Sequence, residues 1–522
     1  MSRHNHRVLP LVALLSWATT ALAQPAQTVP PDLDSYVQRV MTSFDVPGVS
    51  LAIVKDNQVV VARGYGVRKL GDPTAVDGRT LFGIASNTKV FTAAALGLLV
   101  EQGKLQWDAP VINYLPWFQM YDPYVTRELT IRDLLVHRSG LGLGAGDLLW
   151  WPASTYDRKE IARRLRYIKP ATSFRSAYAY DNVLYLVAGE VIEALSGQSW
   201  EDFVSTRILS KAGMTNSNVR HSAAAAGGNV ASPHAPVDGK VRPIQPFDSD
   251  NTNPAGGINA CAEDMAKWMK VLLNEGQLAD GSRLFSAATW RQLSTPVTLQ
   301  PNGPPPPELP ALRSNFRGYA LGLEARDFRG HRVLMHGGAL PGYVSRVLMV
   351  PDLKLGVAVL TNQESDEAFN AIAYAVADAY IGEPRSQWLE GYQTVRARNA
   401  AALAQMEQKT AAARNTASKP SLPLASYARI YRDAWYGDIA IAQEGAKLVM
   451  RFTKTPSLVG DLEHWQYDTF VVRWRDRELR ADAFVTFALN PDGTTDQAKM
   501  QAVSPSVDFS YDFQDLLLRP IK

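Results

Sequence analysis

Cysteine is almost absent from this sequence, which has one residue of this type, Cys261, among 522. A single cysteine excludes an internal disulfide. Cys261 lies between two alanines beside a helical pattern, with no histidine near it in the sequence, so we interpret it as a small core residue and not as a nucleophile. Spaced Cys/His clusters and a His-Glu-x-x-His motif are also missing. The sequence therefore predicts no metal site and no cofactor.

A strong charge of either sign is missing as well. The chain has 54 basic and 51 acidic residues, which gives a formal net charge of +3. This balance gives no reason to expect nucleic acid or an anionic membrane as a partner. We expect a small-molecule or peptide substrate instead, and the sequence leaves the oligomeric state open.

Long apolar runs are confined to the beginning of the chain. Arg3 and Arg7 form a positive region, residues 8–20 are mostly apolar, and Ala21-Leu22-Ala23 is a small-x-small cleavage site. This order predicts a signal peptide over residues 1–23 and not a membrane anchor. No later run is long enough to cross a bilayer, so we expect no membrane span after cleavage. A periplasmic or secreted protein follows from this prediction.

The length of the chain favours two or more domains. Strand patterns occur near both ends of the first 385 residues, with helical segments between them, which indicates an α+β domain over residues 32–385 whose sheet joins both ends. The predicted helices are 32–44 and 368–381; the predicted strands are 49–54, 59–62, 319–325, 332–335, 344–350 and 356–360.

A second, smaller domain follows an alanine-rich segment. Residues 386–423 read as a helical segment that fades into a linker rich in serine and proline. From Ser426 the pattern alternates between apolar and polar residues, with turn signals at Glu444-Gly445 and Asp492-Gly493. Residues 424–522 are therefore predicted to form a small all-β domain, either a barrel or a sandwich.

The chemistry begins at Ser86-Asn87-Thr88-Lys89, which opens a segment, residues 90–100, that is apolar on all faces. Such a helix is buried, and Lys89 lies on the same face as Ser86 because the two are three residues apart. Burial would lower the pKa of Lys89 and make it a proton acceptor for Ser86. Rival motifs are missing: the sequence has no Gly-x-Ser-x-Gly elbow and no phosphate-binding Gly-x-x-x-x-Gly-Lys-Ser/Thr loop.

Three motifs in order resemble those of serine β-lactamases and penicillin-binding proteins. Ser86-x-x-Lys89 is similar to the first motif, Tyr180-Asp181-Asn182 to the Tyr-x-Asn of class C β-lactamases and D-Ala-D-Ala carboxypeptidases, and His336-Gly337-Gly338 to the third. Residues 129–141 and Pro254-Ala255-Gly256-Gly257 resemble further stretches of the family, and the likeness covers about residues 32–385. It implies an antiparallel sheet with helices on both sides.

The resemblance assigns a role to each motif residue. It implies that Ser86, Lys89 and Tyr180 are catalytic, and leaves open which of the last two is the general base. The resemblance also implies that Asn182 holds a substrate amide, and that the strand with Gly338 carries the main-chain N–H of Ala339, which binds the oxyanion together with that of Ser86. A protonated His336 would pair with a substrate carboxylate or with Tyr180, and would so favour anionic substrates at low pH.

Structural alternatives remain for several of these residues. Tyr180 could be a core aromatic, Asn182 a helix cap and His336 a hydrogen-bonded strand histidine. His137 is interpreted as structural, holding a loop. Trp150-Trp151 fits a wall of the cleft as well as it fits core packing.

Two positions depart from the family. Asp181 stands where serine or alanine is common, and it would either point away or raise the pKa of Tyr180. His336 stands where dedicated class C β-lactamases have lysine.

Three functions follow as hypotheses. The first is a peptidase or amidase that acts on D-amino-acid peptides, including peptidoglycan stems. The second is an esterase or weak β-lactamase, and the third is a non-catalytic binding protein on the same scaffold, against which the intact Ser86, Lys89 and Tyr180 argue. The C-terminal region resembles a lipocalin-like accessory domain attached to some of these hydrolases, in which His464 and Asp468 are interpreted as structural.

Overall fold

The computed structural model describes residues 29–224 and 228–521, so the predicted signal peptide lies outside the described residues. A nine-stranded sheet, antiparallel at every neighbouring pair, forms the centre of the first domain. Its strands in spatial order are β3 (Asp72–Ala75), β2 (Gln58–Lys69), β1 (Gly48–Lys55), β13 (Leu355–Thr361), β12 (Tyr343–Val350), β11 (His331–Leu340), β10 (Glu324–Phe328), β9 (Arg317–Tyr319) and β8 (Thr298–Leu299).

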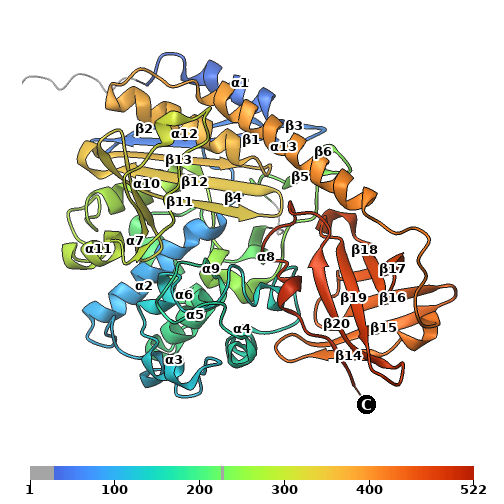
Figure 1. Cartoon of the computed structure of the whole chain (residues 1–522). Helices are drawn as coiled ribbons and strands as arrows, with labels where there is room; N and C mark the ends of the chain where they lie inside the picture. The colour runs from blue at the N-terminus through green and yellow to red at the C-terminus, as the bar shows by residue number, and fades with distance from the viewer. Residues whose placement is uncertain (1–28, 225–227, 522) are drawn as a thin grey trace, which may run out of the picture.

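Helices cover both faces of this sheet, as predicted (Figure 1). Alternate residues of β1 point to opposite faces, because side chains of a strand alternate. Val49, Leu51 and Ile53 belong to one apolar core, which the helices α1 (Leu33–Ser43) and α12 (Asp366–Ile381) complete. Ala52 and Val54 belong to the core on the other face. The sheet is therefore buried on both sides, and residues from both ends of the domain meet in it.

The second face carries the helices that surround the motif residues. The longest of them are α2 (Lys89–Glu101), α5 (Val183–Ser196) and α10 (Ala262–Leu273). Shorter helices fill the space around them: α3 (Pro123–Glu128), α4 (Arg158–Arg164), α6 (Trp200–Val204), α7 (Ser210–Ala212), α8 (His221–Ala224), α9 (Asn253–Gly256) and α11 (Ala287–Ser294). Two short strand pairs complete this half: β4 (Phe82–Gly83) with β7 (Asn259–Ala260), and β5 (His234–Val237) with β6 (Lys240–Pro243).

One predicted strand, residues 319–325, is wrong as a single element. The chain turns back between β9 and β10, with Gly322 at a φ of +82°. A Cβ on Gly322 would lie 2.7 Å from the main-chain nitrogen of Val90, so the turn packs directly against the start of α2. The apolar residues of this segment suggested a continuous strand because they are buried in the turn as well. Only the glycine marked the reversal.

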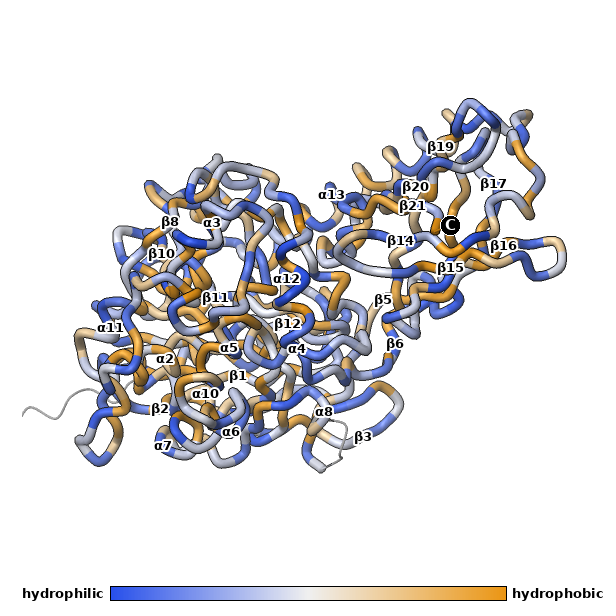
Figure 2. The backbone as a smooth tube through the Cα atoms, turned by 90° about the horizontal axis from the view of Figure 1, so that it is seen from below, coloured by the Kyte–Doolittle hydropathy of each residue, from blue (hydrophilic) through white to orange (hydrophobic). Residues whose placement is uncertain are grey.

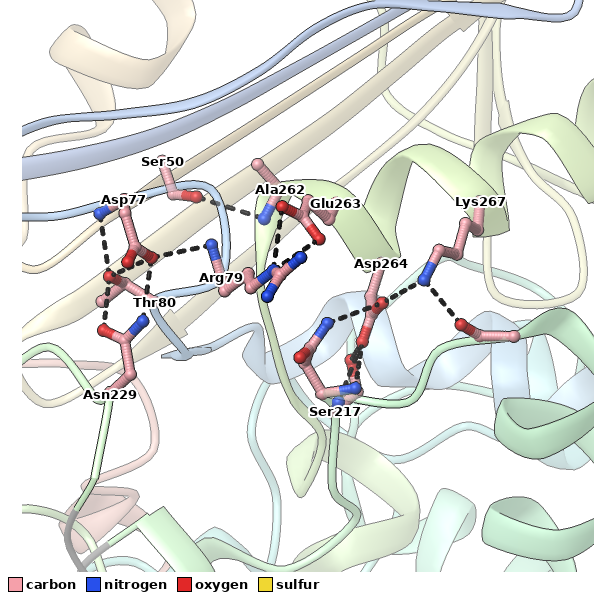
Figure 3. A network of polar contacts seen from close by, with 12 residues as sticks. Ser50, Asp77, Arg79, Thr80, Ser217, Asn229, Ala262, Glu263, Asp264 and Lys267 are labelled. Atoms are coloured by element: carbon pink, nitrogen blue, oxygen red, sulfur yellow. Dashed lines mark hydrogen bonds and ion pairs between the residues drawn. The ribbon is translucent and has the colours of Figure 1, made fainter.

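A polar network fixes the start of α10 against the sheet (Figure 3). The main-chain nitrogen of Ala262 donates to Ser50 Oγ on β1 at 3.2 Å, and Arg79 pairs with Glu263 at 3.1 Å. Asp264 accepts hydrogen bonds from the loop at Ser217. Because β7 leads directly into α10 and pairs with β4, this network also fixes the segment from which the Ser86 turn begins.

The C-terminal domain is an eight-stranded antiparallel barrel, which decides between the two predicted all-β forms. The main-chain groups of Ala498 and Leu518 exchange two hydrogen bonds and nearly close it. Gly445 and Gly493 have positive φ in turns, as their sequence signals indicated. The strands in spatial order are β20 (Thr495–Ala502), β19 (Ala483–Leu489), β18 (Thr469–Trp474), β17 (Val459–Gln466), β16 (Lys447–Phe452), β15 (Gly437–Glu444), β14 (Ile430–Asp433) and β21 (Arg519–Pro520).

The helix α13 (Trp388–Ala412) leads from the first domain to the barrel, which lies beside that domain (Figure 2), and side chains join the two. Arg480 of the barrel domain pairs with Glu364 at 2.7 Å, and Tyr156 donates to the carbonyl of Tyr436 at 2.6 Å. Within residues 29–224 and 228–521, none of the helices has the length and apolar character needed to cross a bilayer.

Candidate active site

Ser86 lies on a tight turn of 3-10 helix, Ala85–Thr88, between β4 and α2. Ala85 is buried and has a φ of +49°, a conformation that is costly for a residue with a side chain. Main-chain bonds hold this turn: Ile84 donates to the carbonyl of Ile258, and Ile258 donates to Thr88 Oγ1. The side chain of Ser86 remains partly exposed. The fold thus holds Ser86 at the head of a buried helix and leaves it open to the cleft.

Lys89 is fully buried, and its amine contacts Ser86 directly. Nζ lies 3.0 Å from Ser86 Oγ, 2.7 Å from Asn182 Oδ1 and 3.1 Å from the carbonyl oxygen of Ala255. These three acceptors match the three N–H groups of an ammonium. The stretch Pro254–Gly257 therefore supplies a carbonyl that orients the lysine. The spacing of Ser86 and Lys89 predicted their contact correctly.

The charge of Lys89 is poorly stabilised. Burial lowers the pKa of Lys89 to about 7, and the nearby carboxylates of Asp147 and Asp181 act in the opposite direction. Near neutral pH the amine is therefore divided between its charged and neutral forms. The neutral form has a lone pair, and at 3.0 Å it can accept the proton of Ser86.

Tyr180 places its hydroxyl beside the same serine. Among the described residues this buried oxygen has no conventional hydrogen bond. Burial raises the pKa of Tyr180 well above its usual value, and its interaction with Ser86 acts against this rise. Lys89 Nζ lies 4.8 Å from the centre of the tyrosine ring. Tyr180 is thus part of the Ser86 cluster and not only a core aromatic.

Asn182 precedes α5 but its side chain does not cap that helix. Its oxygen accepts from Lys89, and its amide nitrogen donates to Asp147 Oδ2 at 2.8 Å. Asp147 is buried, which raises its pKa to about 7. Sequence reasoning missed Asp147, which follows a glycine-rich loop and belongs to no motif. The glycines before Asp147 and the proline after it indicate a loop, and nothing in this segment of the sequence indicates a contact with Asn182.

His137 and Asp181 occupy the space behind Tyr180. His137 Nδ1 accepts from the main-chain nitrogen of Asp181 at 3.2 Å, and its carbonyl accepts from Ala179. This agrees with a loop-holding role. The Asp181 carboxylate lies 3.9 Å from His137 Nδ1, and its pKa is raised by burial to about 7. It therefore acts on Lys89, whose charge it favours, and not chiefly on Tyr180.

The opposite side of the cleft is the end of β11. β10 pairs with β11 only up to Met335, so from His336 onward this edge of β11 is free of β10 and packs against the Ser86 turn. A Cβ on Gly338 would lie 2.2 Å from the carbonyl oxygen of Ile84, which explains the glycine. Ser345 of β12, which pairs with Gly338, bonds the Ser86 turn twice: it donates to the carbonyl of Ile84 and accepts from Asn87.

His336 has partners other than those expected. Nδ1 lies 2.5 Å from the carbonyl of Gly337, which can only accept, and Nε2 lies 2.8 Å from the hydroxyl of Tyr319. Burial lowers the pKa of His336 well below its usual value, and the Lys89 charge lowers it further. These bonds and the lowered pKa favour a neutral ring, and the pairing of a protonated His336 with Tyr180 or with a substrate carboxylate stays a prediction.

These residues line a cavity of about 290 Å³ that includes Ser86, Tyr180, Asn182, Gly338 and Ala339. Trp150 and Trp151 form part of its wall and are also almost fully buried, so both interpretations of this pair hold. The charged side chains Arg346, Asp366 and Asp508 also border it, the last from the C-terminal domain. Among the described residues, no group of three or more His, Cys, Asp or Glu side chains is arranged to hold a metal ion.

The chain belongs to the β-lactamase family, whose sequence pattern matches residues 33–381. Residues 413–520 match a second pattern, a domain of unknown function called DUF3471. This membership, in a family of serine β-lactamases and penicillin-binding proteins, confirms the resemblance drawn from the motifs and makes the chain a hydrolase of that type.

Cys261 is buried, and burial raises the pKa of its thiol to about 12, as expected of a core residue.

Individual relatives agree with this assignment. The chain is 27% identical to the unguisins hydrolase ungD of Aspergillus violaceofuscus over 460 residues, which is 81% of this chain and 78% of that protein. The octameric penicillin-binding protein homologue from Pyrococcus abyssi has a similar fold, with a TM-score of 0.57, 21% identity, and coverage of 93% and 99%. A D-stereospecific amidohydrolase from Streptomyces matches 67% of this chain and 98% of its own, with 22% identity and a TM-score of 0.52.

Proposed function

We propose that this protein is an exported serine hydrolase that forms an acyl-enzyme on Ser86 and cleaves amide bonds in peptides that contain D-amino acids, including peptidoglycan-type peptides. The observation that carries the proposal is the 3.0 Å contact between Ser86 Oγ and the buried amine of Lys89. The predicted signal peptide supports export to the periplasm or the medium. The name of one similar protein, a D-stereospecific amidohydrolase, supports the choice of substrate, and the name of another, a hydrolase of unguisins, supports hydrolysis as the reaction.

The acylation step follows from the geometry. Ser86 Oγ attacks the substrate carbonyl carbon while its proton passes to the neutral amine of Lys89 or to Tyr180 in its phenolate form, a form that the raised pKa of Tyr180 disfavours. The carbonyl oxygen gains the negative charge and takes hydrogen bonds from the main-chain N–H groups of Ser86 and Ala339. Collapse of this intermediate breaks the C–N bond, and the amine leaves with a proton returned by the same groups. Water then attacks the Ser86 ester and releases the acid.

The charged border of the cavity supports a peptide over a neutral ester. Arg346 lies on β12, opposite Gly337 of β11. Among the described residues Arg346 has no salt bridge of 4.0 Å or less, and its Nε has no hydrogen bond. Burial raises the pKa of Asp366 and of Asp508, although the charge of Arg346 opposes the rise at Asp366 and that of Arg480 opposes it at Asp508. Both signs of charge next to Ser86 suit a substrate that has free ammonium and carboxylate groups. A short-chain ester has neither group.

Substrate profiling tests this choice. The measurement is kcat/KM for D-Ala-D-Ala peptides with free or blocked ends, for p-nitrophenyl butyrate and for a chromogenic cephalosporin. We expect the free D-peptides to be cleaved best and blocking of either end to reduce kcat/KM. Faster turnover of the ester or the cephalosporin would instead assign the protein as an esterase or a weak β-lactamase. Tight binding without turnover of any of these would indicate a binding protein.

A further inference from the structure

The C-terminal domain reaches the Lys89 cluster through one buried side chain. Ser510, 4% exposed, donates from its hydroxyl to Asp147 Oδ2 at 2.8 Å. The same carboxylate oxygen accepts from Asn182 Nδ2 at 2.8 Å, and Asn182 Oδ1 accepts from Lys89 Nζ at 2.7 Å. A continuous line of hydrogen bonds therefore runs from the barrel domain to the amine that contacts Ser86.

Asp512, two residues further on, holds the loop that carries Asp147. Its two carboxylate oxygens accept from the main-chain nitrogens of Gly146 and Leu148 at 2.6 and 3.0 Å. Asp512 is fully buried, and Trp150 Nε1 donates to the remaining oxygen of Asp147 at 2.9 Å. The position of Asp147 is thus fixed from its own loop and from a domain more than 350 residues away in sequence.

We propose that Ser510 is a positioning residue of the active site, which acts through Asp147 and Asn182 to hold Lys89. The proposal rests on the proposed function, because it takes Ser86 as the nucleophile. It also gives the C-terminal domain a part in the reaction: the hydrolase domain alone lacks one of the three hydrogen-bond donors of Asp147.

The expected effect on proton transfer follows from the charges around Lys89. Loss of the Ser510 hydroxyl removes a bond that favours ionised Asp147, so the Asp147 carboxyl holds its proton to higher pH. Less negative charge then faces Lys89, and its amine loses its proton at lower pH. The other titratable groups near Lys89 and Asp147 are the same in the wild type and in Ser510→Ala. They are Asp181, Tyr180, Tyr185, His137 and His336 around Lys89, and Asp512 beside Asp147.

The experiment compares the pH profile of fluorophosphonate labelling at Ser86 in the full-length wild type and Ser510→Ala. The pH limb that Lys89 governs should move to lower pH by roughly half a unit. This is the acidic limb if neutral Lys89 is the base, and the basic limb if charged Lys89 assists Tyr180. The maximal rate should fall about ten-fold, because Asn182 loses part of its support. Ser510→Thr keeps the hydroxyl and should restore the wild-type profile.

Two controls separate the outcomes. Ser504→Ala removes a hydroxyl of the same segment that bonds Glu407 instead, and its profile should match the wild type. A lower rate for Ser510→Ala with an unmoved limb would overturn the proposal, because a partly unfolded sample labels less without any change in pH dependence. The proposal also fails if Ser510→Ala behaves as wild type. No labelling of Ser86 in the wild type would instead refute the proposed function itself, and this proposal with it.

Discussion

The two walls on either side of Ser86 are built in different ways. On the helical wall, side chains make the contacts: Lys89 from α2 and Asn182 before α5 bond to each other and to Ser86 or Asp147. On the β11 wall, the close approach is made by main chain, at a glycine, Gly338, that leaves no room for a Cβ. A substitution that removes a functional group should therefore impair the helical wall, whereas one that adds a side chain at Gly338 should impair the β11 wall.

This difference explains which residue identities matter. The helical wall needs particular functional groups, because the proton of Ser86 must move to one of them. The β11 wall needs a particular backbone path, which Ser345 secures by bonding to Ile84 and Asn87. His336 belongs to this second wall in position, yet its ring is occupied by Tyr319 and Gly337.

The largest effect is expected on the helical wall. Lys89→Ala and Tyr180→Phe should each lower the rate of Ser86 acylation by roughly 10²–10⁴, because each removes a group on the path of the proton. The double variant should lose much less than the product of the two, since both groups serve the same transfer. Pre-steady-state acylation kinetics of the three proteins measure this. Fully multiplicative losses would show that the two residues act independently.

A smaller but clear effect is expected on the β11 wall. Gly338→Ala should lower acylation by about 10²-fold, because the added Cβ would lie 2.2 Å from the carbonyl oxygen of Ile84 and push the strand away from Ser86. Gly337→Ala is the matched control. There a Cβ would meet only Arg346 at 3.4 Å, an ordinary contact with a flexible side chain. Equal losses in both variants would contradict the idea that close main-chain approach is the requirement.

The smallest effect is expected from the charge state of His336. Because burial lowers the pKa of His336 well below its usual value, we expect no change in the charge of the ring as the pH passes through 6.5. Profiles of kcat/KM against pH for a carboxylate-bearing peptide and a neutral ester should therefore show no difference that titrates near pH 6.5. A fall in activity toward the anionic substrate alone, as pH rises through 6.5, would restore the anion-selection role.

Sequence reasoning located most of the site because its key contacts are local or marked by motifs. Ser86 and Lys89 are one helical turn apart, and burial of the helix could be read from residues 90–100. The α+β class of the first domain and the all-β class of the second also followed from periodicity, which left the choice between a barrel and a sandwich open. The single strand predicted at 319–325 failed because the turn at Gly322 is apolar and buried, so that its composition resembles a strand.

Contacts between segments distant in sequence could not be read in this way. Asp147 and Ser510 are 363 residues apart, and neither belongs to a motif. The partner of His336 is Tyr319, which no sequence spacing indicates. A histidine in the third motif suggested a cation near the substrate, whereas burial lowers the pKa of His336 well below its usual value. Long-range packing, and not residue identity, decides these roles.

The most direct test of the whole account is the site and pH dependence of covalent labelling. Wild-type protein is treated with a fluorophosphonate from pH 5 to 9, digested, and mapped by mass spectrometry, with Ser86→Ala as the control. The adduct should lie on Ser86. If neutral Lys89 is the base, the rate of Ser86 labelling should rise as the pH increases through about 7, in accord with the lowered pKa of the buried amine. An adduct on any other residue, or labelling of Ser86→Ala at the wild-type rate, would contradict the central claim.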